Sequence, residues 1–202
     1  MDGPGEQPDD QLASLSKDGS LDAFNMLVER YQQPVYNLCL RLLGNQQGAE
    51  DATQEAFLSA YRAISRFQGG SLRSWLLRIA ANQCKDEFRR HKRKYRAGSL
   101  EEIFDTIDQP VEASDPAESP PTRVERAEVA RGLQDALMQL PFYQRRAIVL
   151  VDVLGYPYDE AAEMCETTTG TIKSRIHRAR EKLRGIVRRN PELFGPGSRL
   201  ED

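Results

Sequence analysis

The sequence has little of what marks membrane, secreted and metal-binding proteins. Its 202 residues include three cysteines and two histidines, and Cys39, Cys84 and Cys165 form neither a CxxC pair nor a Cys/His cluster with zinc-ligand spacing. No apolar run approaches the roughly 18 to 20 residues needed to cross a bilayer, and the acidic start "MDGPGEQPDDQ" differs from a secretory signal. We therefore expect a soluble cytoplasmic protein with reduced cysteines in its core, no metal site and no cofactor.

The sequence also has little excess of either charge sign, since 31 acidic and 28 basic side chains leave a formal net charge of only −3. Residues 1–60 nevertheless hold ten acidic and three basic side chains, and residues 97–130 hold nine acidic and two basic ones. The balance reverses in residues 71–96, with nine basic and two acidic side chains, and in residues 171–189, with eight and one. Two separate basic blocks favour two contacts with one polyanion, although solvated helix faces would leave the same pattern.

Alternating strand patterns are absent, and helical periodicity dominates. One apolar stripe steps by three or four residues through Ala49, Ala52, Ala56, Ala60, Ile64 and Phe67. Two helices are predicted before it, with Pro34 in the first turn of the second and Gly44 as its carboxyl-terminal cap. Another is predicted after it, capped by Ser74.

This pattern predicts an all-α fold of two small helical domains joined by an acidic, flexible linker. The predicted boundaries are an acidic tail at 1–20, a first domain at 21–96, the linker at 97–123, a second domain at 124–190 and a tail at 191–202. Because the linker is a tether, the relative placement of the two domains must be set by something else.

The segment "TTTGTIKSRIHRAREKLR", residues 167–184, concentrates positive charge in one predicted helix. At 100° per residue, Ile172, Ile176, Ala179 and Leu183 share an apolar stripe, and small or polar residues lie opposite. A short amphipathic helix, "YDEAAEMCE", precedes it. This order is typical of a helix-turn-helix, whose second helix enters the major groove; an ordinary helical hairpin with a basic solvent face fits as well.

Two long strings carry a family resemblance. "LPFYQRRAIVLVDVLGYPYDEAAEMCETTTGTIKSRIHRAREKLR" resembles region 4 of bacterial sigma factors of the extracytoplasmic-function group. "YQQPVYNLCLRLLGNQQGAEDATQEAFLSAYRAISRF" followed by "SLRSWLLRIAANQCKDEFRRHKR" resembles their region 2. Both matches fall in the family order and together span nearly all of residues 20–188.

The resemblance implies a subunit without catalysis of its own, which binds core RNA polymerase, recognises promoters, helps to open them, and has an anti-sigma factor as a regulatory partner. It implies a stress or envelope regulon. The implied contacts to the duplex minus-35 element are Thr171, Lys173, Ser174, Arg175, His177, Arg178 and Arg180, with Arg175 and Arg180 assigned to phosphates. Those to the single-stranded minus-10 element are Phe67, Gly69, Gly70, Arg73, Trp75, Asn82, Arg89 and Arg90. Trp75 as a core anchor and Asn82 as a structural hydrogen-bonding residue fit equally.

The acidic helix around "AEDATQEAF" resembles the surface that binds the polymerase. The implied contacts are Asp51, Gln54, Glu55, Phe57 and Tyr61, and their charge suits a basic partner. Two residues depart from the family pattern: Pro157 stands where a capping serine is common, and Glu166 where a glycine is common in the turn.

Two other classes stay open at this point. One is a helix-turn-helix regulator that binds promoters without polymerase. The other is a nucleic-acid-processing enzyme, against which the sequence offers no acidic triad, nucleophilic serine or metal-ligand set.

Overall fold

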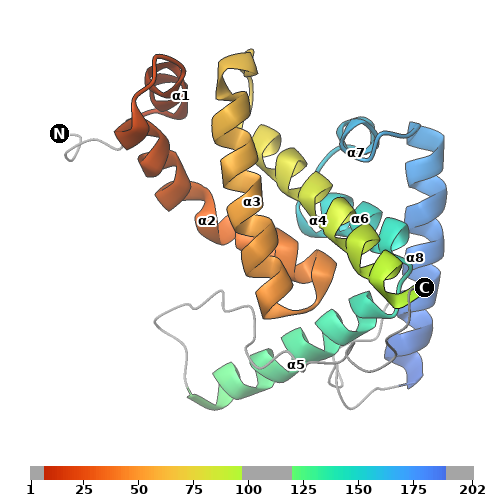
Figure 1. Ribbon diagram of the computed structural model, residues 1–202. Helices are drawn as coiled ribbons and strands as arrows, with labels where there is room; N and C mark the ends of the chain where they lie inside the picture. The colour runs from red at the N-terminus through yellow and green to blue at the C-terminus, as the bar shows by residue number, and fades with distance from the viewer. Residues whose placement is uncertain (1–6, 97–119, 190–202) are drawn as a thin grey trace.

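The computed structural model describes residues 7–96 and 120–189, and within these ranges it contains helices and no strand (Figure 1). The first half holds α1 (Asp9–Lys17), α2 (Leu21–Leu43), α3 (Gln46–Ala63), the short 3-10 turn η1 (Ile64–Arg66) and α4 (Leu72–Arg96). The second half holds α5 (Pro120–Met138), α6 (Phe142–Ile148), the π-helical turn η2 (Val149–Val153), α7 (Tyr158–Met164) and α8 (Thr169–Arg189).

The prediction of an all-α chain with two helical domains is confirmed. Helix α5 begins at Pro120, inside the range expected for the linker. The rest of that linker, residues 97–119, and the tail at 191–202 lie outside the described residues. None of the described helices is both long enough and apolar enough to cross a bilayer.

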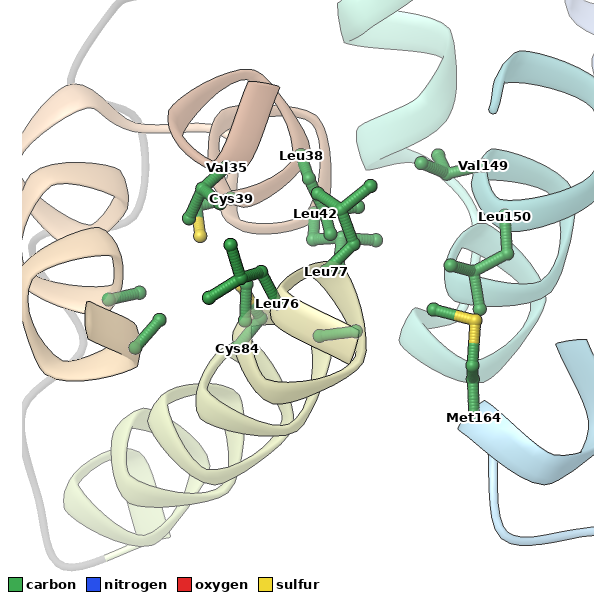
Figure 2. Close-up of a cluster of buried hydrophobic side chains, with 14 of the residues drawn as sticks. Val35, Leu38, Cys39, Leu42, Leu76, Leu77, Cys84, Val149, Leu150 and Met164 are labelled. Atoms are coloured by element: carbon green, nitrogen blue, oxygen red, sulfur yellow. The ribbon is translucent and has the colours of Figure 1, made fainter. Parts of the chain in front are cut away.

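The first domain is built on α2, α3 and α4, each of which packs against the other two. The predicted alanine stripe of α3 is buried, since Ala49, Ala52, Ala56 and Ala60 are each at most 4% exposed. Such small side chains let neighbouring helices approach closely. Larger side chains from α2 and α4, Leu38, Leu42 and Leu77, fill the space between them (Figure 2), and burying each leucine contributes about 2 kcal/mol.

Two cysteines lie inside this core. Cys39 on α2 and Cys84 on α4 are both 0% exposed, and Figure 2 shows them in the same cluster of side chains. A hydrogen bond with Cys39 and burial raise the pKa of the Cys84 thiol. All three cysteines are free; Cys39 and Cys84 are buried as expected, whereas Cys165 is only half-buried.

The structure corrects the interpretation of residues 1–20 as a tail. Within them, α1 places Leu12 in the core at 0% exposure. The Asp9 carboxylate accepts hydrogen bonds from the Arg30 guanidinium and the Tyr31 hydroxyl on α2. Desolvation and the hydrogen bond to Asp9 raise the pKa of Tyr31 to about 12. The sequence analysis missed α1 because it judged these residues by their acidic charge. A count of charges does not detect a short amphipathic helix with one buried face.

The predicted break before Pro34 is also wrong, because α2 runs through it as one helix of 23 residues. A proline removes one backbone donor and can be held inside a helix when packing on both sides supports it. Here Tyr31, Val35 and Leu38 are all buried around it. Gly44 ends the helix in the left-handed region at φ 80°, and its N–H bonds to the Leu40 carbonyl, as predicted.

The second domain packs α6 and α7 against α8. Ile172, Ile176 and Ala179 of α8 are each at most 1% exposed, which confirms the predicted stripe. Between α6 and α7, η2 has a π-type hydrogen bond from the Leu154 N–H to the Val149 carbonyl at 3.0 Å. The extra residue in this turn shifts the chain register just before the helix-turn-helix.

The buried side chains of the two domains form one contiguous cluster. In Figure 2, Val149, Leu150 and Met164 of the second domain lie across from Leu42 and Leu77 of the first. The Phe88 and Phe142 rings stack across this boundary with centroids 4.5 Å apart, and the Gln134 amide donates to the Leu40 carbonyl at 3.1 Å. Direct packing therefore sets the relative placement of the domains.

Candidate nucleic-acid and protein interfaces

Helix α8 runs along one side of the molecule (Figure 1). Lys173, Ser174, His177 and Arg178 are exposed. Their donors and acceptors come from the first half of the helix, which is the part of a second helix that reaches base edges in a helix-turn-helix. The structure thus brings the four foremost predicted duplex contacts onto one open surface.

The start of α8 is fixed by a threonine cap. The Thr168 hydroxyl accepts a hydrogen bond from the Thr171 N–H at 3.2 Å and lies 2.9 Å from the Thr171 hydroxyl. The Ser174 hydroxyl donates to the Thr171 carbonyl at 2.9 Å. Thr171 therefore belongs to the helix start as much as to the exposed face.

The turn before α8 has the strain that the sequence indicated at Glu166. This residue has a φ of 52°, in the left-handed region that favours glycine. Its carboxylate accepts a hydrogen bond from the Lys85 ammonium of α4 at 2.9 Å, and this contact lowers the pKa of Glu166. A contact with the other domain thus accompanies the strained turn.

Helix α7 begins without the side-chain cap that a serine would supply. Pro157 occupies the cap position and makes no side-chain hydrogen bond. Asp159 and Glu160 lie in the first turn, where negative charge is favourable to a helix. These carboxylates offset part of the missing cap.

Two arginines assigned to phosphates are engaged within the protein. The Arg180 guanidinium donates to both carboxylate oxygens of Asp152, at 2.8 and 2.7 Å, and this contact raises its pKa. Arg175 is half-buried, with its guanidinium 5.4 Å from the centre of the Tyr143 ring. Both remain close to the exposed face of α8, but each must leave a partner to bind a phosphate.

The loop between η1 and α4 forms one wall of a small pocket of about 290 Å³. Gly69 and Gly70 have φ values of 96° and 85°, so the loop depends on two residues that adopt the left-handed region freely. Ser71, not the predicted Ser74, caps α4 by accepting from the Ser74 N–H at 3.1 Å. The correction moves the helix start three residues toward the loop.

Aromatic and cationic groups line this pocket. Phe67 is only 5% exposed and packs against Trp75, with ring centroids 5.3 Å apart. Arg66 and Arg78 supply positive charge, and Glu160 and Glu163 of α7 supply negative charge. Phe67 therefore forms a buried wall of the pocket and is not an exposed contact. Trp75 is half-buried, so it both packs against the core and lines the pocket, the two roles that the sequence left open.

The remaining predicted strand contacts lie in different environments. Arg73 and Arg89 are exposed, and Arg90 is exposed but paired with Glu87. Asn82 is half-buried, and its side-chain oxygen accepts a hydrogen bond from Arg146 of the second domain at 2.7 Å. Of the predicted strand contacts, the structure brings Phe67, Gly69 and Trp75 together at the pocket. Gly70 and Arg73 do not line it, and Arg146 covers Asn82.

A second surface is a groove of about 900 Å³ between α2 and α3. Its predicted members include Asp51 and Gln54, which are exposed, Phe57, which is 8% exposed, and Tyr61, which is 41% exposed. Glu55 is exposed on the same helix but does not line the groove. An acidic rim over an apolar floor can bind a partner that combines apolar and basic side chains.

Sequence reasoning missed the half of this groove that α2 contributes. Leu21, Phe24, Val28 and Tyr36 line it from that helix, and Phe24 contacts Tyr61 edge to face with centroids 5.0 Å apart. Burial and the nearby Glu50 raise the pKa of Tyr36. The sequence could have indicated this half of the groove, because α2 has apolar residues on a second face besides the stripe that packs in the core.

No group of three or more side chains suited to hold a metal ion occurs within residues 7–96 and 120–189. The surfaces that the described part of the chain offers are a basic helix, an aromatic pocket lined by charged residues of both signs, and an acidic apolar groove. Together with the fold, the basic helix is typical of a helix-turn-helix nucleic-acid-binding protein.

Comparison with known proteins identifies the family. Residues 27–94 match the family model for sigma-70 region 2, and residues 130–183 match that for sigma-70 region 4. The chain is 34% identical to the ECF RNA polymerase sigma factor SigM of Mycobacterium tuberculosis over 183 residues, covering 90% of this chain and 86% of that one. It is 35% identical to SigW of Bacillus subtilis over 175 residues, covering 85% and 92%.

The fold has solved counterparts. The sigma factor RpoE of Bartonella quintana, solved in complex with the anti-sigma factor NepR, matches with a TM-score of 0.67 and 24% identity over 83% of this chain and 98% of that one. The chain belongs to the ECF sigma factors, the specificity subunits with which RNA polymerase initiates transcription.

Proposed function

We propose that the chain divides the work of a sigma factor among three surfaces. The exposed face of α8 reads the duplex minus-35 element, the glycine loop with α4 holds the single-stranded minus-10 element, and the groove between α2 and α3 binds core polymerase. The observation that carries this proposal is the separation of charge. Asp51 and Glu50 line the groove. On α8, by contrast, basic side chains outnumber acidic ones by eight to one, and the first domain adds Arg66 and Arg78 to the loop pocket.

At the minus-35 element, we assign base contacts to Lys173, Ser174, His177 and Arg178. Lysine and arginine donate to guanine edges, and serine can donate or accept. Thr171, Arg175 and Arg180 lie near enough on α8 to bind the backbone, where most contacts of such proteins fall.

At the minus-10 element, the pocket offers what an unstacked base requires. The Trp75 ring gives an aromatic surface, Arg66 and Arg78 give positive charge, and Gly69 and Gly70 allow a nucleotide to approach the backbone closely. Exposed Arg73, Arg89 and Arg90 on α4 continue the positive charge along the strand.

Partners and setting complete the proposal. The chain acts without catalysis of its own, in the cytoplasm where core polymerase lies, and serves a stress or envelope regulon. A regulatory protein of the anti-sigma class binds it, by analogy with the RpoE–NepR complex.

Run-off transcription with core polymerase on a genomic promoter library tests the central claim. We expect initiation at a defined set of promoters sharing two elements. Promoter binding by the chain without polymerase, or no promoter-specific initiation in any context, would overturn it.

Replacing Arg178 with alanine tests the assignment of α8. Selectivity at one minus-35 position should relax by about tenfold, because a good base contact is worth about 1–3 kcal/mol, while core binding persists. Arg188→Ala is the matched control, since this arginine is exposed in the last turn of the same helix. Loss of core binding in Arg178→Ala would place the helix on polymerase instead.

Replacing Asp51 with lysine tests the groove. Core binding should weaken by about tenfold or more, because a lysine there opposes a basic partner. Glu29→Lys makes the same charge change at an exposed residue of α2 that does not line the groove, and it should bind normally. Equal losses in both variants would show a general charge effect rather than a site.

A further inference from the structure

Helix α1 ends beside the loop that is proposed to hold the minus-10 strand. The helix packs against α2, η1 and α4, and Figure 1 shows it next to the end of α3 that leads into η1. Leu12 and Ala13 bury one face of it, at 0% and 2% exposure. Hydrogen bonds from Arg30 and Tyr31 to the Asp9 carboxylate hold its first turn on α2. The last turn of α1 therefore has a fixed place near η1.

The basic residue of this last turn is Lys17. Its Nζ atom lies 5.4 Å from the centre of the Phe67 ring. The same ring packs against the Trp75 ring and forms part of the pocket wall. Phe67 thus connects the Lys17 ammonium to the aromatic surface on which an unstacked base is proposed to lie.

Lys17 has no anionic partner within the described ranges. Its side chain is exposed, and the contact with Phe67 is the one interaction of its ammonium with the described part of the chain. Lys85 of α4, by contrast, is paired with Glu166. A lysine over an aromatic ring keeps N–H donors on the side away from the ring. Lys17 can therefore bind an anion without giving up an ion pair.

The position of Lys17 complements the other cations of the strand-binding surface. A single strand carries a negative charge at every phosphate, so a strand whose base enters the pocket needs positive charge on both sides of that point. Exposed Arg89 and Arg90 extend positive charge along α4, away from the loop. Lys17 supplies charge at the loop end of the surface, from a different helix.

We infer that Lys17 is a further DNA-binding residue, whose ammonium binds a backbone phosphate of the single-stranded minus-10 element. This inference rests on the proposed function, since it extends the same strand-binding surface. A lysine contact with a phosphate carries no base preference, so it adds affinity for the melted strand without adding sequence selectivity. Helix α1 then positions a DNA contact as well as completing the core.

The salt dependence of strand binding by the holoenzyme tests this inference. The probe is fluorescein-labelled DNA from a promoter found in the run-off screen, with its minus-10 element left unpaired and its minus-35 element omitted. Lys17→Met removes the charge and keeps an unbranched chain that can pack against Phe67. The slope of log affinity against log salt should become shallower by about 0.7, the value of one phosphate contact on a single strand. An unchanged slope would overturn the inference.

Two further variants separate charge from packing. Lys17→Arg keeps the charge and should keep the slope of the unmodified chain. Lys17→Gln removes the charge with a polar side chain and should match Lys17→Met. If Lys17→Arg is as shallow as the neutral variants, the effect comes from the shape of the side chain, and the phosphate contact is refuted.

Lys182→Met is the matched control. This exposed lysine lies in the second half of α8, whose proposed duplex site the probe lacks, so its slope should equal that of the unmodified chain. Equal flattening in the Lys17 and Lys182 variants would show a general charge effect and would overturn the assignment of Lys17.

A contact between Lys17 and polymerase would give a different result. Core binding by Lys17→Met should equal that of the unmodified chain, and weaker core binding would place Lys17 on polymerase instead of DNA. The loss of strand affinity should also be uniform across promoters, as expected of a phosphate contact. A loss confined to one minus-10 sequence would indicate a base contact and refute the phosphate assignment.

Transcription by the unmodified chain separates this inference from the proposed function. If the unmodified holoenzyme initiates at no promoter, the proposed function fails, and the role of Lys17 fails with it. If the unmodified holoenzyme initiates and Lys17→Met binds the probe with an unchanged salt slope, the role of Lys17 alone fails.

Discussion

Gly44 offers a sharp test of how the two domains are joined. It ends α2 at a φ of 80°, and an added Cβ would overlap the Sδ and Cε atoms of Met138 on α5 and lie 2.9 Å from its Cγ. The Met138 sulfur also accepts a hydrogen bond from the buried Arg145. Gly44→Ala therefore adds a backbone strain and displaces a residue on which the second domain depends.

The two costs can be separated by a matched variant. Gly19→Ala has the same left-handed strain at φ 94° but no atom within 4 Å of the new Cβ. We expect Gly19→Ala to lower the free energy of unfolding by about 1–2 kcal/mol from the backbone alone. Gly44→Ala should lose about 1–2 kcal/mol more, at the low end for overpacking because methionine adapts its shape.

Urea unfolding at equilibrium, followed by circular dichroism, measures both variants. In a Met138→Ala background, adding Gly44→Ala should cost only the backbone strain, as Gly19→Ala does, because the steric contact is gone. Equal losses for Gly19→Ala and Gly44→Ala would refute the reasoning, because the contact with Met138 would then carry no energy.

Three further predictions concern stability and charge. Ile176→Ala should cost about 2–5 kcal/mol in urea unfolding, since this side chain is 1% exposed in the core of the second domain. The pKa of Tyr31 in the folded protein is raised to about 12 from an ordinary 10.0, so the free energy of unfolding should fall as pH rises between these values. Tyr31→Phe should remove that fall. An unchanged pH profile in this variant would exclude Tyr31 as its source. Asp152→Asn should release Arg180 and cost less than about 1 kcal/mol of stability. It should also steepen the salt dependence of promoter binding by the holoenzyme by about one phosphate contact. An unchanged slope would mean that Arg180 does not reach the DNA backbone.

Local patterns predicted the helices that have one buried face. The alanine stripe of α3 and the isoleucines of α8 follow the helical period closely, because both helices pack on one side only. Helix α1 and the continuity of α2 through Pro34 were missed for a common reason. Both depend on packing partners that lie elsewhere in the chain, such as Arg30 and Tyr31 for Asp9.

The candidate site divides in the same way. The exposed face of α8 follows from the helical period alone, so Lys173, Ser174 and Arg178 were placed correctly on the surface. The burial of Phe67 and the contact of Asn82 with Arg146 join segments that lie far apart in the sequence. The spacing of residues within one helix cannot predict such contacts, because Asn82 and Arg146 lie on different helices.

The rates at which the three thiols react with an alkylating reagent report two different movements of the protein. An alkylating reagent needs a thiolate, and Cys39 and Cys84 lie fully enclosed between α2 and α4, so they should react only when these helices separate. Cys165 is half-buried next to the Lys85–Glu166 contact, so its reaction should follow smaller movements of the second domain. Counting modified cysteines by mass spectrometry would then distinguish parting of the domains from unfolding of the first domain, without any added label.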